Sequence, residues 1–331
     1  MRRPRPARAE DGVILLTVML IVAVMSALAV AIVDDIRYGV KRTVNAALRD
    51  QAYWYALGLE HFATLIVERS WEAAPGKSTL NDPWAQEGAR FPIEGGFIDG
   101  VIADGSNCFN VNSLVGVEEG SRDPINREAA AQFQALLTAL DVGPGAELAI
   151  VNGVADWIDA DNAPLARGAE DYLYTNLTPP YRTGDTLMAD VTELRAVQTV
   201  TERAYRAMRP YVCALPTTGM SPVNINTLRE EDAPLLAMLF PGRLDVEAAR
   251  RVIADRPAGG YDAIEEFWGL PSIQQVRPPE GRRPNLQVWT EFYDLSARVV
   301  YQEAYFQLQA TFRLDGQGKL RFVSRRFGAF E

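Results

Sequence analysis

The chain has 331 residues, of which 48% are hydrophobic and 23% charged, with a formal net charge of −10. This composition excludes a disulfide-dense mini-protein, a disordered chain and a membrane protein with many spans. The acidic balance argues against broad nucleic-acid binding, because the release of counterions from phosphates needs a basic face. The length fits one large domain or roughly two ordinary ones.

The N-terminal region has a sharp charge polarity. Residues 1–12 carry +2, which leaves −12 on the remaining 319 residues. Residues 13–33 then form a run of 21 residues without a charged side chain. As a helix this run would be about 31 Å long, enough to cross the hydrocarbon core of a membrane. Arginines before the run and Asp34-Asp35 after it predict a cytoplasmic N-terminus, with the bulk of the chain outside the inner membrane.

The apolar pattern continues as a helix beyond this span. Residues 34–70 contain no proline, and Pro75-Gly76 supplies the stop signal. The apolar residues recur at helical spacing: Ile36, Val40, Val44, Leu48, Tyr55, Leu59, Phe62 and Ile66. The prediction is one helix from residue 13 to about 70, apolar all round in its first half and amphipathic in its second. A cleaved signal peptide with a site near Ala27, Ala29 and Ala31 is the alternative.

Short strands are expected on both sides of a helical region. Residues 91–102 read as a glycine-broken hairpin, and residues 304–314 and 320–323 read as two strands joined by a turn at 315–318. Helical periodicity between them predicts helices over 128–140, 146–158, 191–200, 202–208, 233–240, 246–254 and 261–268. Strands at both ends indicate a sheet that carries a large helical insertion.

Five short segments carry a family resemblance through their order and spacing. They are Asp11-Gly12 before the apolar run, residues 51–58 (QAYWYALG), 108–114 (CFNVNSL), 212–216 (VCALP) and 224–227 (NINT). The long helix resembles the type IV pilin class, and the whole pattern resembles the minor pseudopilin K family of type II secretion (general secretion pathway protein K). The resemblance covers nearly the whole chain. It implies an α+β, pilin-like fold, in which a long N-terminal α-helix packs on an antiparallel β-sheet and a large α-helical domain is inserted between strands.

The resemblance also implies a domain organisation. Residues 1–12 would be a cytoplasmic leader, 13–33 the transmembrane part of the helix and 34–72 its periplasmic part. The sheet region would comprise 73–109 and 290–331. The inserted helical domain would comprise 110–289, with a second half of the helix-hairpin-helix or SAM-like kind.

Processing and assembly follow from the same resemblance. Prepilin peptidase would cleave after Gly12 and leave Val13 as a methylated first residue. Thr17 then stands at mature position five, where most pilins have a glutamate that this family lacks. That glutamate neutralises the terminal ammonium of a neighbouring subunit inside an apolar bundle, where a bare charge is costly. A subunit without this glutamate has no charge that must be paired with a subunit above. The resemblance therefore implies a position at the tip. The alternative is that Thr17 is a tolerated polar residue in a membrane helix.

An acidic loop has a composition suited to a metal ion. Calcium prefers six to eight hard oxygen ligands, and the loop offers them closely spaced along the chain. The spacing alone leaves calcium and a solvated helix-capping loop open, and it does not match an EF-hand. The family resemblance implies a structural calcium site in the helical domain. The ligand candidates are Asp159, Asp161, Asn162, Glu170 and Asp171, with Asp156 in reserve.

Cys108 and Cys213 are the two cysteines of the chain, and both fall on the outer side of the membrane. In an oxidising compartment such a pair favours a disulfide, with two separate buried thiols as the alternative.

No enzymatic activity is expected. His61 is the single histidine, and it lies in the long helix without a nucleophile near it in sequence. The chain contains no nucleophile elbow, phosphate loop or zinc-protease motif. A membrane-anchored enzyme would need a catalytic constellation that these patterns do not offer.

The function implied by the resemblance is that of a minor pseudopilin at the pseudopilus tip, which initiates assembly and supports export of folded proteins. Its partners would be I- and J-type minor pseudopilins, the major pseudopilin, prepilin peptidase and the inner-membrane secretion platform, with secreted substrates as further contacts and no nucleic acid. It would cross the inner membrane once, with its bulk in the periplasm. The alternative is a membrane-anchored binding module of the competence or DNA-receptor type. Its hairpin would lie at residues 240–244, which lack the Gly-x-Gly pattern of such modules.

Overall fold

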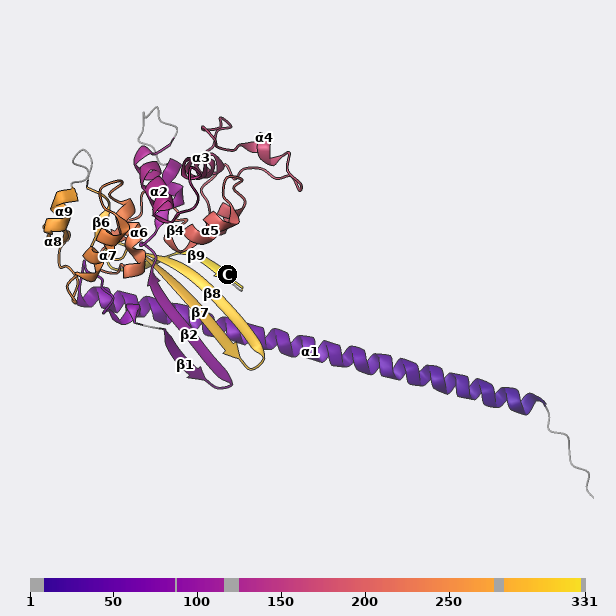
Figure 1. The fold of residues 1–331 in the computed structure, drawn as a ribbon. Helices are drawn as coiled ribbons and strands as arrows, with labels where there is room; N and C mark the ends of the chain where they lie inside the picture. The colour runs from indigo at the N-terminus through magenta and orange to yellow at the C-terminus, as the bar shows by residue number, and fades with distance from the viewer. Residues whose placement is uncertain (1–8, 87, 116–124, 277–282, 329–331) are drawn as a thin grey trace, which may run out of the picture.

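The long N-terminal helix dominates the shape of the molecule. The computed structural model describes residues 9–86, 88–115, 125–276 and 283–328. Helix α1 (Ala9–Ala73) runs under the rest of the protein and projects far beyond it (Figure 1). It ends just before Pro75-Gly76, where Gly76 takes a positive φ of 79°. The predicted helix from 13 to about 70 is therefore confirmed, with a few more residues at each end.

A five-stranded antiparallel sheet packs on the distal half of α1. Its strands are β1 (Ala89–Ile93), β2 (Gly96–Asp104), β7 (Phe292–Tyr301), β8 (Ala304–Leu314) and β9 (Leu320–Phe327), in the order β1-β2-β7-β8-β9. Along each strand, alternate side chains point toward α1, because successive side chains of a strand lie on opposite faces of the sheet. Val299 and Leu308 from the sheet meet Ala52 and Ala56 of α1, and all four are buried. Small alanines on the helix let the sheet approach closely.

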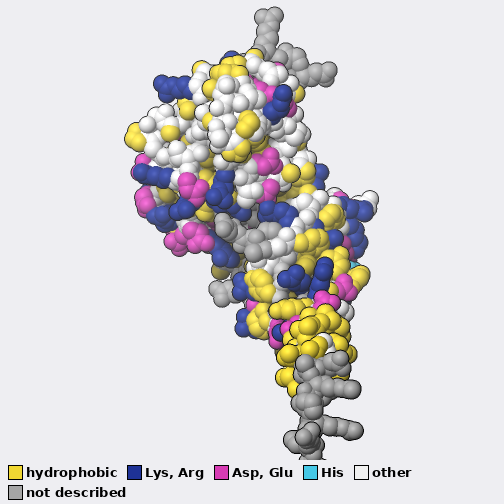
Figure 2. Space-filling view, turned by 90° about the vertical axis from the view of Figure 1, so that its right-hand side faces the viewer, with side chains coloured by type: hydrophobic (Ala, Val, Ile, Leu, Met, Phe, Trp, Pro, Cys, Tyr) yellow, Lys and Arg dark blue, Asp and Glu magenta, His cyan; other side chains and the backbone are white. Residues whose placement is uncertain are grey.

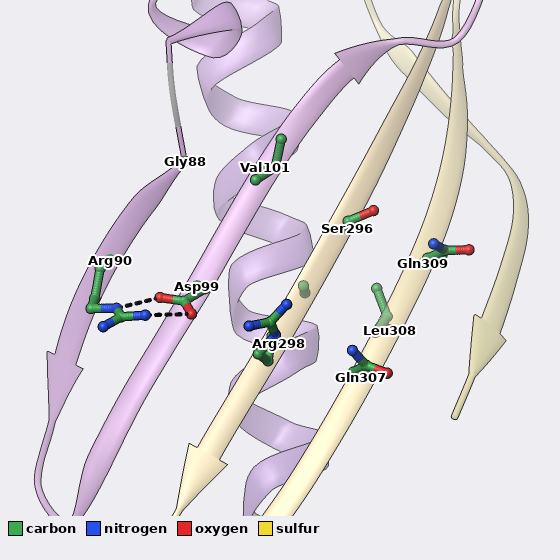
Figure 3. A pocket seen from close by; sticks show the side chains of 10 residues that line it. Gly88, Arg90, Asp99, Val101, Ser296, Arg298, Gln307, Leu308 and Gln309 are labelled. Carbon is green, nitrogen blue, oxygen red and sulfur yellow. Dashed lines mark hydrogen bonds and ion pairs between the residues drawn. The ribbon is translucent and has the colours of Figure 1, made fainter. Parts of the chain in front are cut away.

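The other face of the sheet is polar. Figure 3 shows this face, with Asp99, Arg298 and Gln307 standing on it and α1 behind. Arg90 Nε lies 2.6 Å from Asp99 Oδ1 across strands β1 and β2. The alternation of apolar and polar faces fixes the register of the sheet, because a shift by one residue would exchange them.

The helical domain lies between the end of β2 and the start of β7, at the distal end of α1 (Figure 1). Its largest core cluster includes the fully buried Phe133, Leu136 and Phe240. Its α-helices are α2 (Arg127–Ala139), α3 (Glu147–Ile158), α4 (Asp171–Tyr174), α5 (Glu202–Met208), α6 (Ala233–Met238), α7 (Val246–Ala254), α8 (Ile264–Trp268) and α9 (Pro271–Val276). Its 3-10 turns are η2 (Val111–Val115), η3 (Val191–Arg195), η4 (Arg209–Tyr211) and η5 (Glu230–Asp232), and a further turn, η1 (Pro83–Ala85), follows α1. This arrangement confirms the α+β fold with a helical insertion.

Two predicted helices are wrong in extent. The segment 191–200 forms only the 3-10 turn η3 (Val191–Arg195). Asp190 and Glu193 make the capping box that starts this turn, and Val197 N then donates to Leu194 O, three residues back, as in a further turn and not an α-helix. The segment 261–268 is helical only from Ile264, because the backbone of Tyr261 is bound by the side chain of Asn226 instead.

The two Asn-x-Asn segments, residues 110–112 and 224–226, form equivalent turns, in which the first asparagine side chain accepts a hydrogen bond from the N–H of the second. Strand β3 (Phe109–Asn110) pairs in parallel with β4 (Val212–Cys213), and β5 (Val223–Asn224) pairs in parallel with β6 (Leu286–Gln287). The second asparagine of each segment is buried and binds distant backbone. Asn112 binds both the N–H and the C=O of Met188, and Asn226 does the same with Tyr261. These asparagines therefore organise the helical domain and are not exposed binding residues.

A buried polar joint connects the sheet to the helical domain. Asp104 at the end of β2 accepts hydrogen bonds from the hydroxyls of Thr227 and Thr290, at 2.6 and 2.5 Å, and from the N–H of Ser106. Burial nevertheless raises the pKa of Asp104 to about 6. One carboxyl thus joins the sheet, the second Asn-x-Asn turn and the segment that returns to β7.

Candidate metal centre

The acidic loop begins at the end of helix α3 and returns at the start of α4. Asp156 lies in the last turn of α3 and is completely buried, and Asp159 caps the helix. Glu170 immediately precedes α4 and is only 1% exposed. The loop can close because position 168 has no side chain. A Cβ at Gly168 would lie 1.8 Å from Asp156 Oδ2.

Three carboxylates converge at this point. One oxygen each from Asp156, Asp159 and Glu170 lie within 4.8 Å of one another. Both Glu170 oxygens and Asp159 Oδ1 are buried without a hydrogen-bond partner among the described residues. Buried polar oxygens are normally paired, so these orphaned atoms make the cluster a candidate site for a ligand.

The electrostatics of the cluster support a cation. Burial is the largest cause that raises the pKa of Asp156 and of Asp159 to about 6 and that of Glu170 to about 7. Repulsion from neighbouring carboxylates, including Asp161, adds to it. A divalent cation would offset both effects by neutralising the three charges. Carboxylates without a histidine or cysteine among them suit calcium or another hard cation better than zinc.

Three of the six predicted ligand residues therefore meet, and three do not. Asp161 is exposed and accepts a hydrogen bond from Ala163 N, although its charge still raises the pKa of Asp159. Asn162 is exposed on the same loop. Asp171 points to Arg182 and Thr183, whose contacts hold its pKa below the usual range. The sequence patterns also missed Asp185, whose charge acts on Asp159 although 26 residues separate them.

Cys108 and Cys213 form a disulfide, with Cα atoms 5.7 Å apart. The bond joins the segment after β2 to β4 and spans 105 residues of sequence. It ties the first half of the helical domain to the entrance of the sheet, as expected from the cysteine pair.

The N-terminal part of α1 is exposed and apolar. An 18-residue window of it has a mean hydropathy of 2.9, and none of that window is buried in the protein. Figure 2 shows hydrophobic side chains covering the helix where it leaves the globular body. Thr17 donates its hydroxyl to Ile14 O within the same helix at 2.9 Å. Gly12 lies in α1 and Val13 is exposed, while residues 1–8 of the expected leader lie outside the described part of the chain.

The fold and its apolar helix define a class. The chain is a pilin-like protein with an N-terminal helix long and apolar enough to cross a membrane once, a sheet packed on that helix and a helical domain inserted into the sheet. Residues 107–217 and 223–288 match two family models, both described as type II secretion system (T2SS), protein K.

Relatives of the same description match over nearly full length. Type II secretion system protein K of Pectobacterium carotovorum is 37% identical over 97% of each chain, and that of Aeromonas hydrophila is 36% identical over 98% of this chain and 99% of its own. The fold also matches a chain in the crystal structure of the GspK–GspI–GspJ complex from the enterotoxigenic Escherichia coli type 2 secretion system. That match has a TM-score of 0.77 and 26% identity, and covers 87% of this chain and all of the other. The chain belongs to the type II secretion system protein K family, a structural component of the secretion machinery, and the DNA-receptor alternative has no support.

Proposed function

We propose that this protein forms the tip of the periplasmic pseudopilus together with I- and J-type minor pseudopilins, initiates its assembly and supports export of folded proteins. The observation that carries the proposal is the near-complete structural match to a chain crystallised in a GspK–GspI–GspJ complex. The finer parts of the proposal follow from the shape and chemistry of α1 and the helical domain.

The helical domain supports a terminal position. It lies across the distal end of α1, where a narrow pilin subunit would leave room for the next one (Figure 1). Thr17, near the N-terminal end of α1, also supports a terminal position. Its hydroxyl donates to a carbonyl of its own helix, and it has no negative charge that could neutralise the terminal ammonium of a neighbouring subunit. A broad head without an acidic position-five residue suits a subunit that has none above it.

The anchor and the partners follow from the same arrangement. The apolar helix would hold the subunit in the inner membrane, with its bulk in the periplasm, until prepilin peptidase cleaves after Gly12. The helix would then pack against sister helices above the major pseudopilin and the inner-membrane platform. The role is structural and not enzymatic. At the tip, the helical domain would contact the secreted substrates.

The proposed cofactor is a calcium ion held by Asp156, Asp159 and Glu170. An ion there would fix the loop between α3 and α4, whose carboxylates otherwise repel one another. Its role would be structural.

The tip function is tested by complementation. A strain that lacks this chain but keeps the other pseudopilins should stop secreting its exoproteins, and the wild-type gene should restore secretion. A strain that secretes normally without the chain would contradict the proposal. Enrichment of exoproteins on the purified chain tests the substrate contact separately.

A further inference from the structure

The joint between the sheet and the helical domain is built around one carboxylate, that of Asp104. Thr227 Oγ1 donates to Asp104 Oδ2 at 2.6 Å, and Thr290 Oγ1 donates to the same oxygen at 2.5 Å. Asp104 Oδ1 accepts the N–H of Ser106 at 2.8 Å. The three partners are buried, whereas Asp104 itself keeps some contact with solvent. A proton from solvent can therefore reach a carboxylate whose hydrogen bonds lie inside the joint.

No cation among the described residues balances this carboxylate. Its hydrogen-bond donors are two hydroxyls and one backbone N–H, all of them neutral. The basic side chains of the flanking segments are engaged with other groups: Lys77 with Asp262, Arg313 with Glu291, and Arg256 with the backbone carbonyls of Ile225 and Leu228. A negative charge held in this way is costly, and desolvation raises the pKa of Asp104 to about 6.

The other ionisable groups that face the joint carry no positive charge. Tyr293 of β7 pairs with Asp104 in the sheet register, and burial raises its pKa, so its hydroxyl stays neutral. Asp82, from the segment after α1, acts on Tyr293. Asp294 lies beyond Gly105, where a Cβ would come within 2.9 Å of Asp294 Oδ2, and desolvation raises its pKa as well. Asp294 is therefore the neighbour whose titration must be separated from that of Asp104.

The joint contains an acceptor for a second arrangement of its protons. Thr227 Oγ1 lies 3.2 Å from Asn224 O as well as 2.6 Å from Asp104 Oδ2, and its single proton serves one of them at a time. A proton bound to Asp104 Oδ2 can be donated to Thr227 Oγ1, while the Thr227 hydroxyl turns to Asn224 O. Asn107 Nδ2 donates to Thr227 Oγ1 at 2.8 Å, so this second arrangement uses the full capacity of the hydroxyl.

We propose that Asp104 is a proton-binding site that regulates how firmly the helical domain is held on the sheet. One proton from solvent forms an O–H bond on Asp104 Oδ2, the Thr227 hydroxyl turns to Asn224 O, and no other covalent bond changes. The neutral joint is the tighter one, because it keeps its hydrogen bonds and desolvates no charge. Thr227 is a positioning residue for the bound proton. This inference depends neither on the acidic loop nor on a position at the tip.

Infrared difference spectroscopy of the full chain in detergent tests the proton site directly. Between pH 7.5 and pH 5 the wild type should gain the C=O stretching band of a neutral carboxylic acid at Asp104. Asp104→Asn should lack that contribution, whereas Asp294→Asn, the matched control, should retain it. Thr227→Val removes the acceptor of the proton and should shift the frequency of the band, while Thr227→Ser should leave it in place.

Amide hydrogen exchange measures how firmly the joint is held. The N–H groups of Asn224 and Thr290 are bonded to side chains of the joint, Asn107 Oδ1 and Ser78 Oγ. A pKa of about 6 in the closed joint and about 4 in the open chain predicts about tenfold stronger protection at pH 5 than at pH 7.5, after correction for intrinsic exchange. This tenfold factor should disappear in Asp104→Asn and remain in Asp294→Asn.

The outcomes separate the proton site from its effect on the joint. The same carboxylic acid band in wild type and Asp104→Asn would overturn the proton site. A band that Asp104→Asn lacks, with the same pH dependence of amide protection in both chains, would overturn the regulatory role. If Asp104→Asn does not fold, the Thr227 variants decide, and identical band frequencies in Thr227→Val and Thr227→Ser would overturn the assignment.

Discussion

Gly168 is the residue on which closure of the acidic loop depends most directly. Because Gly168 has no side chain, Asp156 Oδ2 can occupy the space beside its Cα. A Cβ at this position would lie 1.8 Å from that oxygen and clash with it. The buried end of α3 cannot retreat, because Asp156 is fully enclosed. Glycine at this position thus decides whether three carboxylates can meet.

Gly168→Ala should therefore weaken Ca²⁺ binding by at least tenfold and destabilise the protein by roughly 1–3 kcal/mol, as overpacking does. Calorimetric titration and thermal melting measure the two effects. Gly259→Ala is the control, since a Cβ there meets nothing within 4 Å. Equal affinity in both variants would show that the loop closes differently.

The raised pKa values of Asp156, Asp159 and Glu170 predict an unusual pH dependence. Without a cation, the folded protein holds protons on these groups up to about pH 6–7, whereas the unfolded chain releases them near pH 4. The folded state binds more protons in between, so its stability should fall as pH rises from about 4 to 7.5.

Melting in chelator at pH 5 and pH 7.5 measures this effect. From pH 5 to pH 7.5 the melting temperature of the wild type should fall more than that of Glu170→Gln, in which one of the titrating groups is absent. Calcium at about 100 times its Kd should add about 2.7 kcal/mol at pH 7.5, or roughly 4 °C for a chain of this length. A melting temperature indifferent to millimolar calcium, or rising with pH in chelator, would contradict the site.

Of the six residues that the sequence predicts as ligands, three come together in the structure. Acidic residues at the end of an apolar helix, followed by a glycine and another acid, were enough to find Asp156, Asp159 and Glu170. Asp171 could not be excluded in advance, because Arg182 and Thr183 reach it only after the intervening segment has folded back. Asp185 gave no local signal at all.

At the scale of elements, the paired Asn-x-Asn turns hold the helical domain together. Asn112 makes three hydrogen bonds to backbone that is distant in sequence, and no part of it is exposed. Removal of its amide leaves buried backbone groups of Met188 and Leu215 without partners.

Asn112→Ala should cost about 2–4 kcal/mol of unfolding free energy, because each buried group left unpaired costs about 1–3 kcal/mol. Urea unfolding followed by tryptophan fluorescence would measure it. Asn176→Ala, which removes one exposed bond to Tyr172 O, should change stability by less than about 0.5 kcal/mol. Similar losses in the two variants would contradict the structural role of the motif.

Helices and strands with strong periodicity were predictable, and short elements fixed by distant contacts were not. Helices α5 and α7 and strand β8 have the boundaries that their patterns predicted. Strand β7 was not identified as a separate strand, although its buried and exposed residues alternate. The prediction of a helix over 191–200 was wrong, because capping by Asp190 and Glu193 favours a single 3-10 turn.

At the scale of the whole molecule, one disulfide ties the helical domain to the sheet. Closing 105 residues of sequence between Cys108 and Cys213 should stabilise the fold by about 4–5 kcal/mol in the chain-entropy model. The double variant Cys108→Ser/Cys213→Ser should unfold correspondingly earlier in urea. A loss below about 1 kcal/mol would show that the hydrogen-bonded turns alone hold the joint.

The anchor helix makes a prediction about assembly. Thr17→Glu would place a carboxylate in an apolar bundle with no ammonium above it, so secretion should fall sharply. Thr17→Val removes only a bond within the helix and should secrete normally. Normal secretion by Thr17→Glu together with failure of Thr17→Val would contradict a charge-free tip position.

The large-scale organisation was the most predictable feature. A charge-free run of 21 residues, an unbroken amphipathic continuation and strands at both ends were sufficient for the anchor, the long helix and the interrupted sheet. The way in which the helical domain sits on the sheet was not predictable, because it depends on Asp104, Thr227 and Thr290 meeting across long separations.

Co-assembly with the I- and J-type minor pseudopilins of the same secretion system is the decisive measurement for a tip position. The full chain, purified with both partners in detergent, should form a complex with one copy of each, and N-terminal sequencing of the mature chain should begin at Val13. The complex should end at this subunit, with no second copy added when the chain is in excess. A chain that retains Met1 and binds neither partner would contradict its role as a minor pseudopilin at the tip.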